Sequence, residues 1–314
     1  MGGTKILSSA INSEDGIIAT VKESTVPGES KKHYVNQLSS IIKKTIQEAK
    51  VSEESIKAVC IGFPGALDPY TGIVNFAPNL KVRNIPIKKM LEEVISYPVL
   101  IENDVNLGAL GIKKFGVAKN GKNVLTVFIG TGIGGALTFN GKIYRGSGFV
   151  AGEIGHIIID PQGPRCNCGN KGCFETIASR SAIVKNIESD IKADKRTVLR
   201  KIIKQGRPIK SKALSSAVKE KDEITLKHVD KACETIGFVL ANINNLLDLD
   251  MIILGGGLME ALDHYMLPRI KAAFKKNVMK GSAKNIKIKS TKLADDAALY
   301  GGLALAEEFL NLKI

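Results

Sequence analysis

Four side chains that can bind a metal lie close together in the middle of this sequence: His156, Cys166, Cys168 and Cys173. One imidazole and three thiolates form the tetrahedral nitrogen and sulfur set that zinc prefers, and four protein ligands leave no open position for a substrate. Crowded cysteines indicate metal binding rather than disulfide bonds in the reducing cytoplasm, where we expect this protein to reside. The cluster therefore predicts a structural zinc, in preference to three incidental buried cysteines and one loop histidine.

A glycine-rich segment, Gly130 to Gly135, follows an apolar run and matches the G-x-G-x-x-G pattern of dinucleotide-binding proteins. That pattern requires the glycines to open a helix. Here the residues from Ala136 to Phe139 predict a strand instead, and the pair Asn140-Gly141 predicts a two-residue hairpin turn. Two glycine-flanked strands joined by a tight turn can instead present backbone N–H groups to nucleotide phosphates, with the Thr131 hydroxyl as a further donor. A structural hairpin without a ligand is the alternative.

A candidate catalytic carboxylate, Asp104, follows Asn103 where an apolar run passes into a helical pattern. Side chains at the ends of strands project toward ligands in open α/β sheets. Phosphoryl transfer needs little more from a protein than positioning, charge neutralisation and a group that accepts the proton of the attacking hydroxyl. Asp104 suits that last task, but Asp is also a common helix N-cap. The local sequence leaves both interpretations open.

The elements around these residues alternate between strands and helices, which is typical of α/β proteins. A chain of 314 residues is long enough for about two domains. A second set of strands begins at Val124, residues 181–245 are helical and rich in lysine, and an apolar strand at 251–254 leads into Gly255, Gly256 and Gly257. A last helix is expected from about Asp296 to Leu310.

Composition narrows the possible partners. Hydrophobic residues make up 44% of the chain and charged residues 24%, which are globular proportions. The net charge of +14 would suit a nucleic acid, but the lysines are dispersed, Trp is absent and aromatic residues are only 5%, so no stacking platform for bases is evident. No apolar run approaches the length of a membrane-spanning helix. We therefore expect neither a nucleic-acid nor a membrane partner.

Together these residues resemble the ROK family of repressors, open reading frames and kinases, and within it most of all the bacterial ATP-dependent glucokinases. The similarity covers nearly the whole chain. It rests on nine short segments: Gly2 to Lys5, Gly62 to Gly65, Ala77 to Leu80, Glu102 to Asp104, Gly130 to Gly135, Ala151 to His156, Cys166 to Glu175, Gly255 to Gly257, and Asp296 to Leu299.

The resemblance implies an actin-like, ribonuclease-H-like fold, in which two α/β domains surround a cleft for ATP and sugar. We expect the smaller domain at residues 1–112, completed by the last helix at 298–314. The larger domain, with the zinc motif and the helical segment, is expected at 113–297. Family members carry a short apolar strand ending in Asp directly before the first glycines, whereas Met1 stands before Gly2 here. That strand is thus expected to be absent from this sequence, through a late start assignment or a truncation.

The resemblance also implies a function: transfer of a phosphoryl group from ATP with Mg²⁺ to a hexose, most of all glucose, in a homodimer or homotetramer. Fructose, mannose or an N-acetylated amino sugar are alternative substrates, and a non-catalytic sugar-sensing regulator is an alternative role. Asp104 would be the general base, and His156 would turn one ring nitrogen to zinc and the other to the sugar. The residues expected to bind the sugar are Gly65, Asn79, Asn103, Asp104, Glu153, His156 and Glu175. Those expected to bind ATP are Gly2, Gly3, Thr4, Lys5, Thr131, Gly132, Gly255, Gly256 and Gly257.

Overall fold

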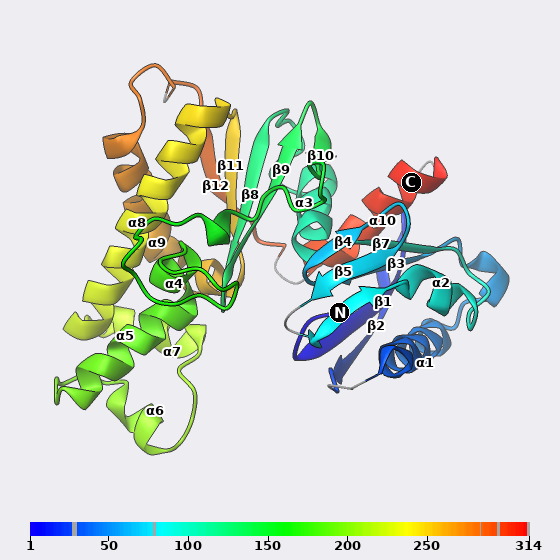
Figure 1. Cartoon of the computed structure of the whole chain (residues 1–314), viewed down its shortest axis with the longest axis horizontal. Coiled ribbons are helices and arrows are strands. Elements are labelled where there is room, and N and C mark those ends of the chain that lie inside the picture. The colour runs from blue at the N-terminus through cyan, green and yellow to red at the C-terminus, as the bar shows by residue number, and fades with distance from the viewer. Residues whose placement is uncertain (27–29, 78–79, 283, 294–295, 313–314) are drawn as a thin grey trace. The chain divides into compact units, whose positions relative to one another are not determined.

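The computed structural model describes residues 1–26, 30–77, 80–282, 284–293 and 296–312. These form two compact units, each with its own hydrophobic core (Figure 1). Unit 1 comprises residues 1–119, 143–151 and 295–314, and unit 2 comprises 120–142 and 152–294. The segment 143–151 therefore belongs to the first unit, although the boundaries expected from the sequence assign it to the second domain. Among the described residues, no helix is long and apolar enough to cross a membrane.

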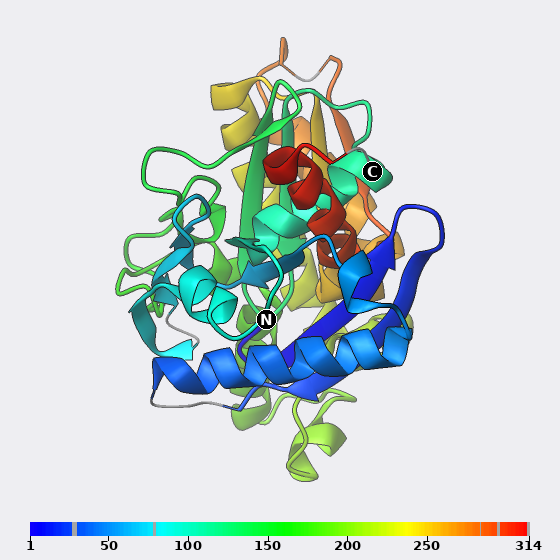
Figure 2. The same cartoon turned by 90° about the vertical axis from the view of Figure 1, so that its right-hand side faces the viewer.

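Unit 1 combines short strands with three longer helices. Its elements are β1 (Lys5–Asn12), β2 (Gly16–Ser24), α1 (Lys31–Ala49), the 3-10 helix η1 (Glu53–Ser55), β3 (Val59–Phe63), β4 (Ala66–Asp68), β5 (Ile73–Ala77), β6 (Val82–Ile85), α2 (Ile87–Glu92), β7 (Val99–Asn103), α3 (Asp104–Phe115) and α10 (Asp296–Leu310). The expected last helix is thus confirmed from Asp296 to Leu310, whereas residues 311–312, which the expected range 298–314 also included, are not helical. Helix α1 begins at Ser30, whose side chain accepts a hydrogen bond from the His33 N–H, and it runs alongside β1 and β2 (Figure 2).

The strands of unit 1 form three small sheets. β1 pairs antiparallel with β2, β3 pairs parallel with β7, and β4, β5 and β6 form an antiparallel sheet. A cavity of about 860 Å³ is lined by β1, β3, α1 and α10. Two hydrogen bonds connect the start of the chain to strands on this cavity: the Met1 amino group donates to the Gly62 carbonyl at 2.6 Å, and the Gly2 N–H donates to the Lys5 carbonyl at 2.8 Å.

Helices α3 and α10 touch each other through glycines. A β-carbon at Gly301 of α10 would lie 1.8 Å from the Leu107 carbonyl oxygen of α3, and one at Gly111 of α3 would lie 1.9 Å from the Ala297 carbonyl oxygen. Only glycine allows so close an approach of two helix backbones. Since Asp104 is the first residue of α3, this contact also determines where the candidate base stands.

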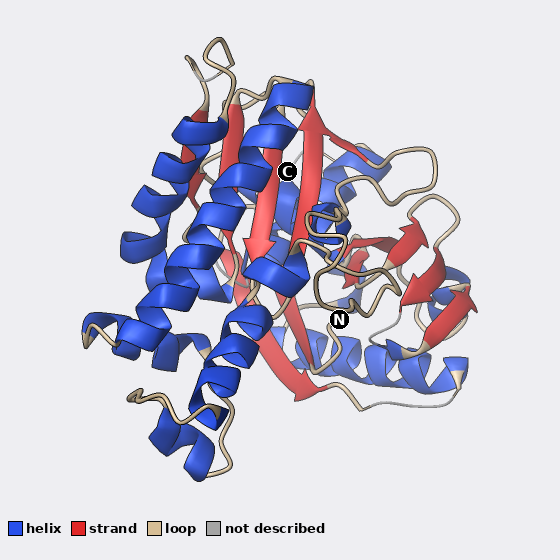
Figure 3. Ribbon diagram, turned by 60° about the vertical axis from the view of Figure 1, so that its left-hand side comes forward, coloured by secondary structure: helices blue, strands red, loops and turns tan. Residues whose placement is uncertain are grey.

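Unit 2 consists of a sheet and a layer of helices (Figure 3). Its strands are ordered β9-β8-β11-β12, in which β8 and β11 are parallel and β8 and β9 antiparallel. Asn140 and Gly141 both have positive φ, as the predicted hairpin turn requires, and lead into β10. β10 (Lys142–Tyr144) begins at the last residue of the segment 120–142 of unit 2 and continues into the segment 143–151 of unit 1. The other elements of unit 2 are β8 (Val124–Ile129), β9 (Ile133–Phe139), the 3-10 helix η3 (Ile154–His156), α4 (Glu175–Ala178), α5 (Arg180–Lys192), α6 (Arg200–Lys204), α7 (Ser211–Lys219), α8 (Glu223–Leu247), β11 (Met251–Gly255), α9 (Gly257–Asn277) and β12 (Lys287–Ser290).

We predict that Gly301→Ala lowers the free energy of unfolding by about 2 kcal/mol, because the added methyl group overlaps the Leu107 carbonyl and forces α3 and α10 apart. Urea denaturation measures this change. Gly281→Ala is the matched control, because a β-carbon there would meet no atom within 4 Å; its effect should stay below about 0.5 kcal/mol. Equal stability of the two variants would contradict the close helix contact.

Candidate active site and metal centre

The candidate base and its neighbours stand at one edge of the sheet of unit 1. β3 and β7 are parallel, with Phe63 opposite Asn103, so the residues that follow both strands meet at the same edge. The Asn103 side chain donates to the Gly65 carbonyl at 3.1 Å and accepts from the N–H groups of Val105 and Asn106. Asn103 is therefore the N-cap of α3. This leaves Asp104 free of the capping role that the sequence allowed for it.

The Asp104 carboxylate is half-buried at the first position of α3. Its Oδ1 accepts the N–H of Val105 at 3.0 Å. Burial raises the pKa of this carboxyl above its ordinary value, and the neighbouring Met1 ammonium and the backbone N–H groups only partly oppose that shift. A carboxyl whose pKa lies nearer neutrality accepts a proton more readily, as a general base must.

The glycine segment of unit 2 is a β-hairpin and does not open a helix. β8 and β9 pair from Val124 opposite Thr138 to Ile129 opposite Ile133, and the Gly130 N–H closes the turn on the Gly132 carbonyl at 2.9 Å. The hairpin predicted from the sequence is therefore confirmed, and the dinucleotide-binding interpretation, in which the glycines open a helix, does not apply.

Two of the predicted phosphate-binding glycine segments lie together. β11 runs parallel to β8 with Gly255 opposite Phe128, so Gly256, the N-cap of α9, reaches the same edge of the sheet as the hairpin turn. A helix of this length presents unpaired N–H groups and the positive end of its dipole to an anion. The third predicted segment, Gly2 to Lys5, belongs to unit 1.

The metal-ligating atoms of His156, Cys166, Cys168 and Cys173 all lie within 4.8 Å of one another. The Sγ atoms of Cys168 and Cys173 are 3.6 Å apart, and His156 Nδ1 is 3.6 Å from Cys166 Sγ. A tetrahedral zinc with bonds of about 2.3 Å spaces its ligands about 3.8 Å apart. The four residues therefore lie close to the spacing that such an ion requires and could hold it.

Local backbone geometry explains why these cysteines converge. Cys166 donates its N–H to the Asn170 carbonyl at 2.8 Å and accepts the Gly169 N–H at 3.1 Å, which makes a tight loop. Gly172 has φ of +68°, and a β-carbon there would lie 1.5 Å from the Asp160 carbonyl oxygen. Only glycine fits at this position, directly before Cys173.

Carboxylates flank the histidine of the cluster on both sides. His156 Nδ1 faces the cysteines and lies 3.8 Å from Glu175 Oε1, whereas Nε2 lies 3.8 Å from Glu153 Oε2. The two ring nitrogens thus have different neighbours, as expected if only one of them binds a metal. Glu175 also reaches the glycine hairpin, since a β-carbon at Gly132 would lie 2.6 Å from its Oε2.

The structure adds two residues that sequence reasoning did not single out. Arg180, the first residue of α5, donates from Nη2 to the Thr131 hydroxyl at 2.6 Å and from its backbone N–H to the Gly130 carbonyl. Arg145 forms an ion pair with the buried Glu102. No local sequence pattern marks either arginine, because each acts across many intervening residues.

The predicted sugar ligand Asn79 lies outside the described residues.

Comparison with known proteins identifies the family. The model of the ROK family matches residues 1–309. The chain belongs to the ROK family. It is 31% identical over 312 residues to the glucokinase of Halalkalibacterium halodurans, covering 99% of this chain and 94% of that protein. It is 29% identical over 289 residues to the xylose repressor of Caldicellulosiruptor bescii, covering 88% of this chain and 69% of the repressor.

A solved structure confirms the fold class of this ROK chain. The ROK family glucokinase from Streptomyces griseus, crystallised with glucose and AMPPNP, superposes with a TM-score of 0.84 at 28% identity, covering 98% of this chain and 97% of that one. The expected actin-like α/β ATPase fold is therefore correct. The family contains both kinases and repressors, so membership alone leaves the activity of this chain to its own residues.

We predict that Cys168→Ser lowers bound zinc from about one ion per chain to near zero and lowers Tm at the same time, because binding energy at a structural site is folding energy. Elemental analysis of the purified protein and a thermal melt measure the two effects. Cys233→Ser is the control, since Cys233 is a buried cysteine of α8 outside the cluster and its loss should leave zinc content unchanged. A wild-type protein without zinc would refute the metal assignment.

Proposed function

We propose that this chain transfers the γ-phosphoryl group of ATP to a hydroxyl of a hexose, with glucose as the first candidate. The observation that carries the proposal is Asp104: a half-buried carboxyl with a raised pKa, at the first position of α3 and not occupied in capping it. The similarity to glucokinases along almost the whole chain supports it. The reaction would take place in the cytoplasm, where ATP is available, and the expected homodimer or homotetramer stays a prediction.

In the proposed reaction Asp104 takes the proton of the attacking hydroxyl. The hydroxyl oxygen forms a bond to the γ-phosphorus, the bond from that phosphorus to the bridging oxygen breaks, and ADP leaves with the bond electrons. Asn103 and Gly65, linked by their hydrogen bond, would orient the sugar in unit 1. Glu153, His156 and Glu175 are the proposed sugar ligands of unit 2. A bound zinc would supply only rigidity, by holding the His156 ring in one orientation.

ATP, bound with Mg²⁺, is assigned to the glycine segments. The hairpin turn with Thr131 and Gly132 and the α9 N-terminus after Gly255 and Gly256 would bind phosphate oxygens in unit 2. Gly257 completes that segment, and Gly2, Gly3, Thr4 and Lys5 are the proposed counterpart in unit 1. Arg180, bonded to Thr131, is a positive charge placed to stabilise the same phosphates.

A sugar-sensing regulator without catalysis is the second candidate. The similarity to a xylose repressor favours it, since that relative shares 29% identity over most of this chain. The two candidates differ in one respect: a regulator binds sugar but does not consume ATP.

We predict ATP-dependent phosphorylation of glucose, measured by coupled ADP release over a panel of glucose, fructose, mannose and N-acetylated amino sugars. Asp104→Asn should lower kcat by about 10² to 10⁴ while sugar binding persists, because a positioned base contributes that much. Wild-type kcat/KM should fall as pH decreases through the pKa of Asp104, and this fall should occur at a higher pH than an ordinary aspartate would give, because burial raises that pKa. Sugar binding without turnover in the wild type would favour the regulator, and near-normal turnover of the variant would remove Asp104 from the base role.

We predict that Arg180→Met raises KM for ATP about tenfold and changes KM for the sugar little, because a charge-assisted hydrogen bond to phosphate is worth about 1.5 kcal/mol or more. Steady-state kinetics with each substrate varied in turn separates the two constants. Lys185→Met removes the same charge from an exposed position of α5 and is the control. The same KM for ATP in both variants would show that Arg180 does not reach the nucleotide.

A further inference from the structure

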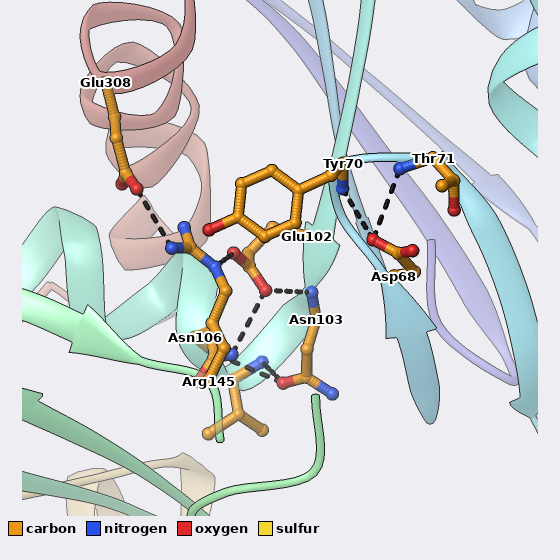
Figure 4. A network of polar contacts seen from close by, with 9 residues as sticks. Asp68, Tyr70, Thr71, Glu102, Asn103, Asn106, Arg145 and Glu308 are labelled. Atoms are coloured by element: carbon orange, nitrogen blue, oxygen red, sulfur yellow. Dashed lines mark hydrogen bonds and ion pairs between the residues drawn. The ribbon is translucent and has the colours of Figure 1, made fainter. Parts of the chain in front are cut away.

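A buried ionic network in unit 1 includes Glu102, Asn103 and Arg145 and reaches the residues next to the candidate base in the sequence (Figure 4). Glu102 is the residue of β7 that precedes Asn103 and Asp104, and its side chain is only 2% exposed. Arg145 donates from Nε to Glu102 Oε2 at 2.7 Å and from Nη1 to Glu308 Oε1 of α10 at 2.9 Å. The Arg145 side chain is 8% exposed and that of Glu308 is 39% exposed, so the network runs from the interior to the surface.

The second oxygen of Glu102 accepts hydrogen bonds from residues next to the proposed base. Oε1 accepts the backbone N–H of Asn103 at 2.9 Å and the side-chain amide of Asn106 at 3.1 Å. Both residues belong to the start of α3, where Asn103 is the cap and Asn106 lies on the first turn. One oxygen of Glu102 thus accepts a hydrogen bond from Arg145, and the other accepts hydrogen bonds at the start of α3, where Asn103 and Asp104 lie.

The arginine is itself held on several sides. The rings of Tyr70 and Phe309 lie 5.9 Å and 5.6 Å from its guanidinium carbon, so aromatic groups cover the charge. Burial opposes its charged form, but hydrogen bonds and the charges of Glu308 and Glu102 raise the pKa of Arg145 overall. Its Nη2 is buried and has no hydrogen-bond partner within the described part of the chain. The guanidinium is therefore fully charged and fixed in place.

Such a network is a poor way to gain stability. A buried ion pair loses most of its Coulomb energy to desolvation, and apolar residues of similar volume often stabilise a core as well or better. A carboxylate has two acceptor oxygens at fixed positions. Those of Glu102 accept hydrogen bonds from three donors, which belong to β7, α3 and the segment 143–151. An amide has a single acceptor oxygen and cannot serve both sides.

We propose that Glu102 is a positioning residue, which, clamped by Arg145, holds the end of β7 and thereby the geometry of Asn103 and Asp104 toward the hexose. The kinetic measurements that test this proposal rest on the proposed function. The measurement of glucose affinity does not require catalysis. The Glu102 side chain is 2% exposed and both of its oxygens accept hydrogen bonds within the protein, so it would act through the Asn103 backbone N–H and the Asn106 amide.

The test compares Glu102→Gln with Glu308→Gln in the full chain. Glu102→Gln should lower kcat/KM for the hexose about 10²-fold and leave KM for ATP unchanged, because misplacement of a reacting group by about 1 Å costs that much. Glu308→Gln removes the outer carboxylate of the same arginine and should change kcat/KM less than about threefold. Glucose affinity, measured by titration calorimetry, should fall in Glu102→Gln and not in Glu308→Gln.

Arg145→Lys extends the test if Glu102→Gln does not fold. It keeps the charge but loses the fork that reaches both carboxylates, and it should lower kcat/KM by an intermediate factor of about ten. A folded Glu102→Gln or Arg145→Lys variant with the kinetics and glucose affinity of Glu308→Gln would overturn the proposal, as would an equal rise of KM for ATP. A wild-type protein that binds glucose without turnover refutes the kinase assignment alone, since the calorimetric comparison still decides the role of Glu102.

Discussion

Parallel pairing of neighbouring strands is the constraint on which the candidate sites of both units depend. Parallel strands end at the same edge of a sheet, so the segments that follow them meet there even when they are far apart in sequence. In unit 1 the pairing of β3 with β7 brings Gly65 to Asn103. In unit 2 the pairing of β8 with β11 brings the glycine hairpin to the α9 N-terminus. The candidate base of unit 1 and the candidate phosphate-binding segments of unit 2 thus each lie at one edge of a sheet.

The metal centre follows a different logic, because its ligands are close in sequence and need no sheet to assemble them. A tight loop between Cys166 and Asn170 and the glycine before Cys173 bring the thiols together. In the proposed function the cluster acts through its histidine, whose second nitrogen lies 3.8 Å from Glu153 Oε2. Glu175 lies at both the metal ligands and the glycine hairpin, so one carboxylate connects two of the three predicted site elements of unit 2.

Two carboxylates near the start of α3, Glu102 and the candidate base Asp104, differ in their surroundings. Asp104 is half-buried, with its pKa raised by burial, whereas Glu102 is buried and forms an ion pair with Arg145. A general base has to accept and release a proton, whereas a group that fixes geometry has to keep its hydrogen bonds. Separation of these tasks between Glu102 in β7 and Asp104 in α3 explains why two carboxylates only two positions apart have such different partners.

The sequence by itself determined the clustering of the four candidate metal ligands, the hairpin interpretation of the glycine segment and the α/β class, because each depends on local spacing or local turn chemistry. Cysteine spacing, the Asn140-Gly141 pair and strand–helix alternation are properties of short segments. Only the tertiary structure decided that Asn103 rather than Asp104 caps α3, and that Arg180 and Arg145 reach Thr131 and Glu102. The two arginine contacts join residues that are 49 and 43 positions apart, and no periodic pattern encodes which side chains will face each other once the strands have paired and twisted.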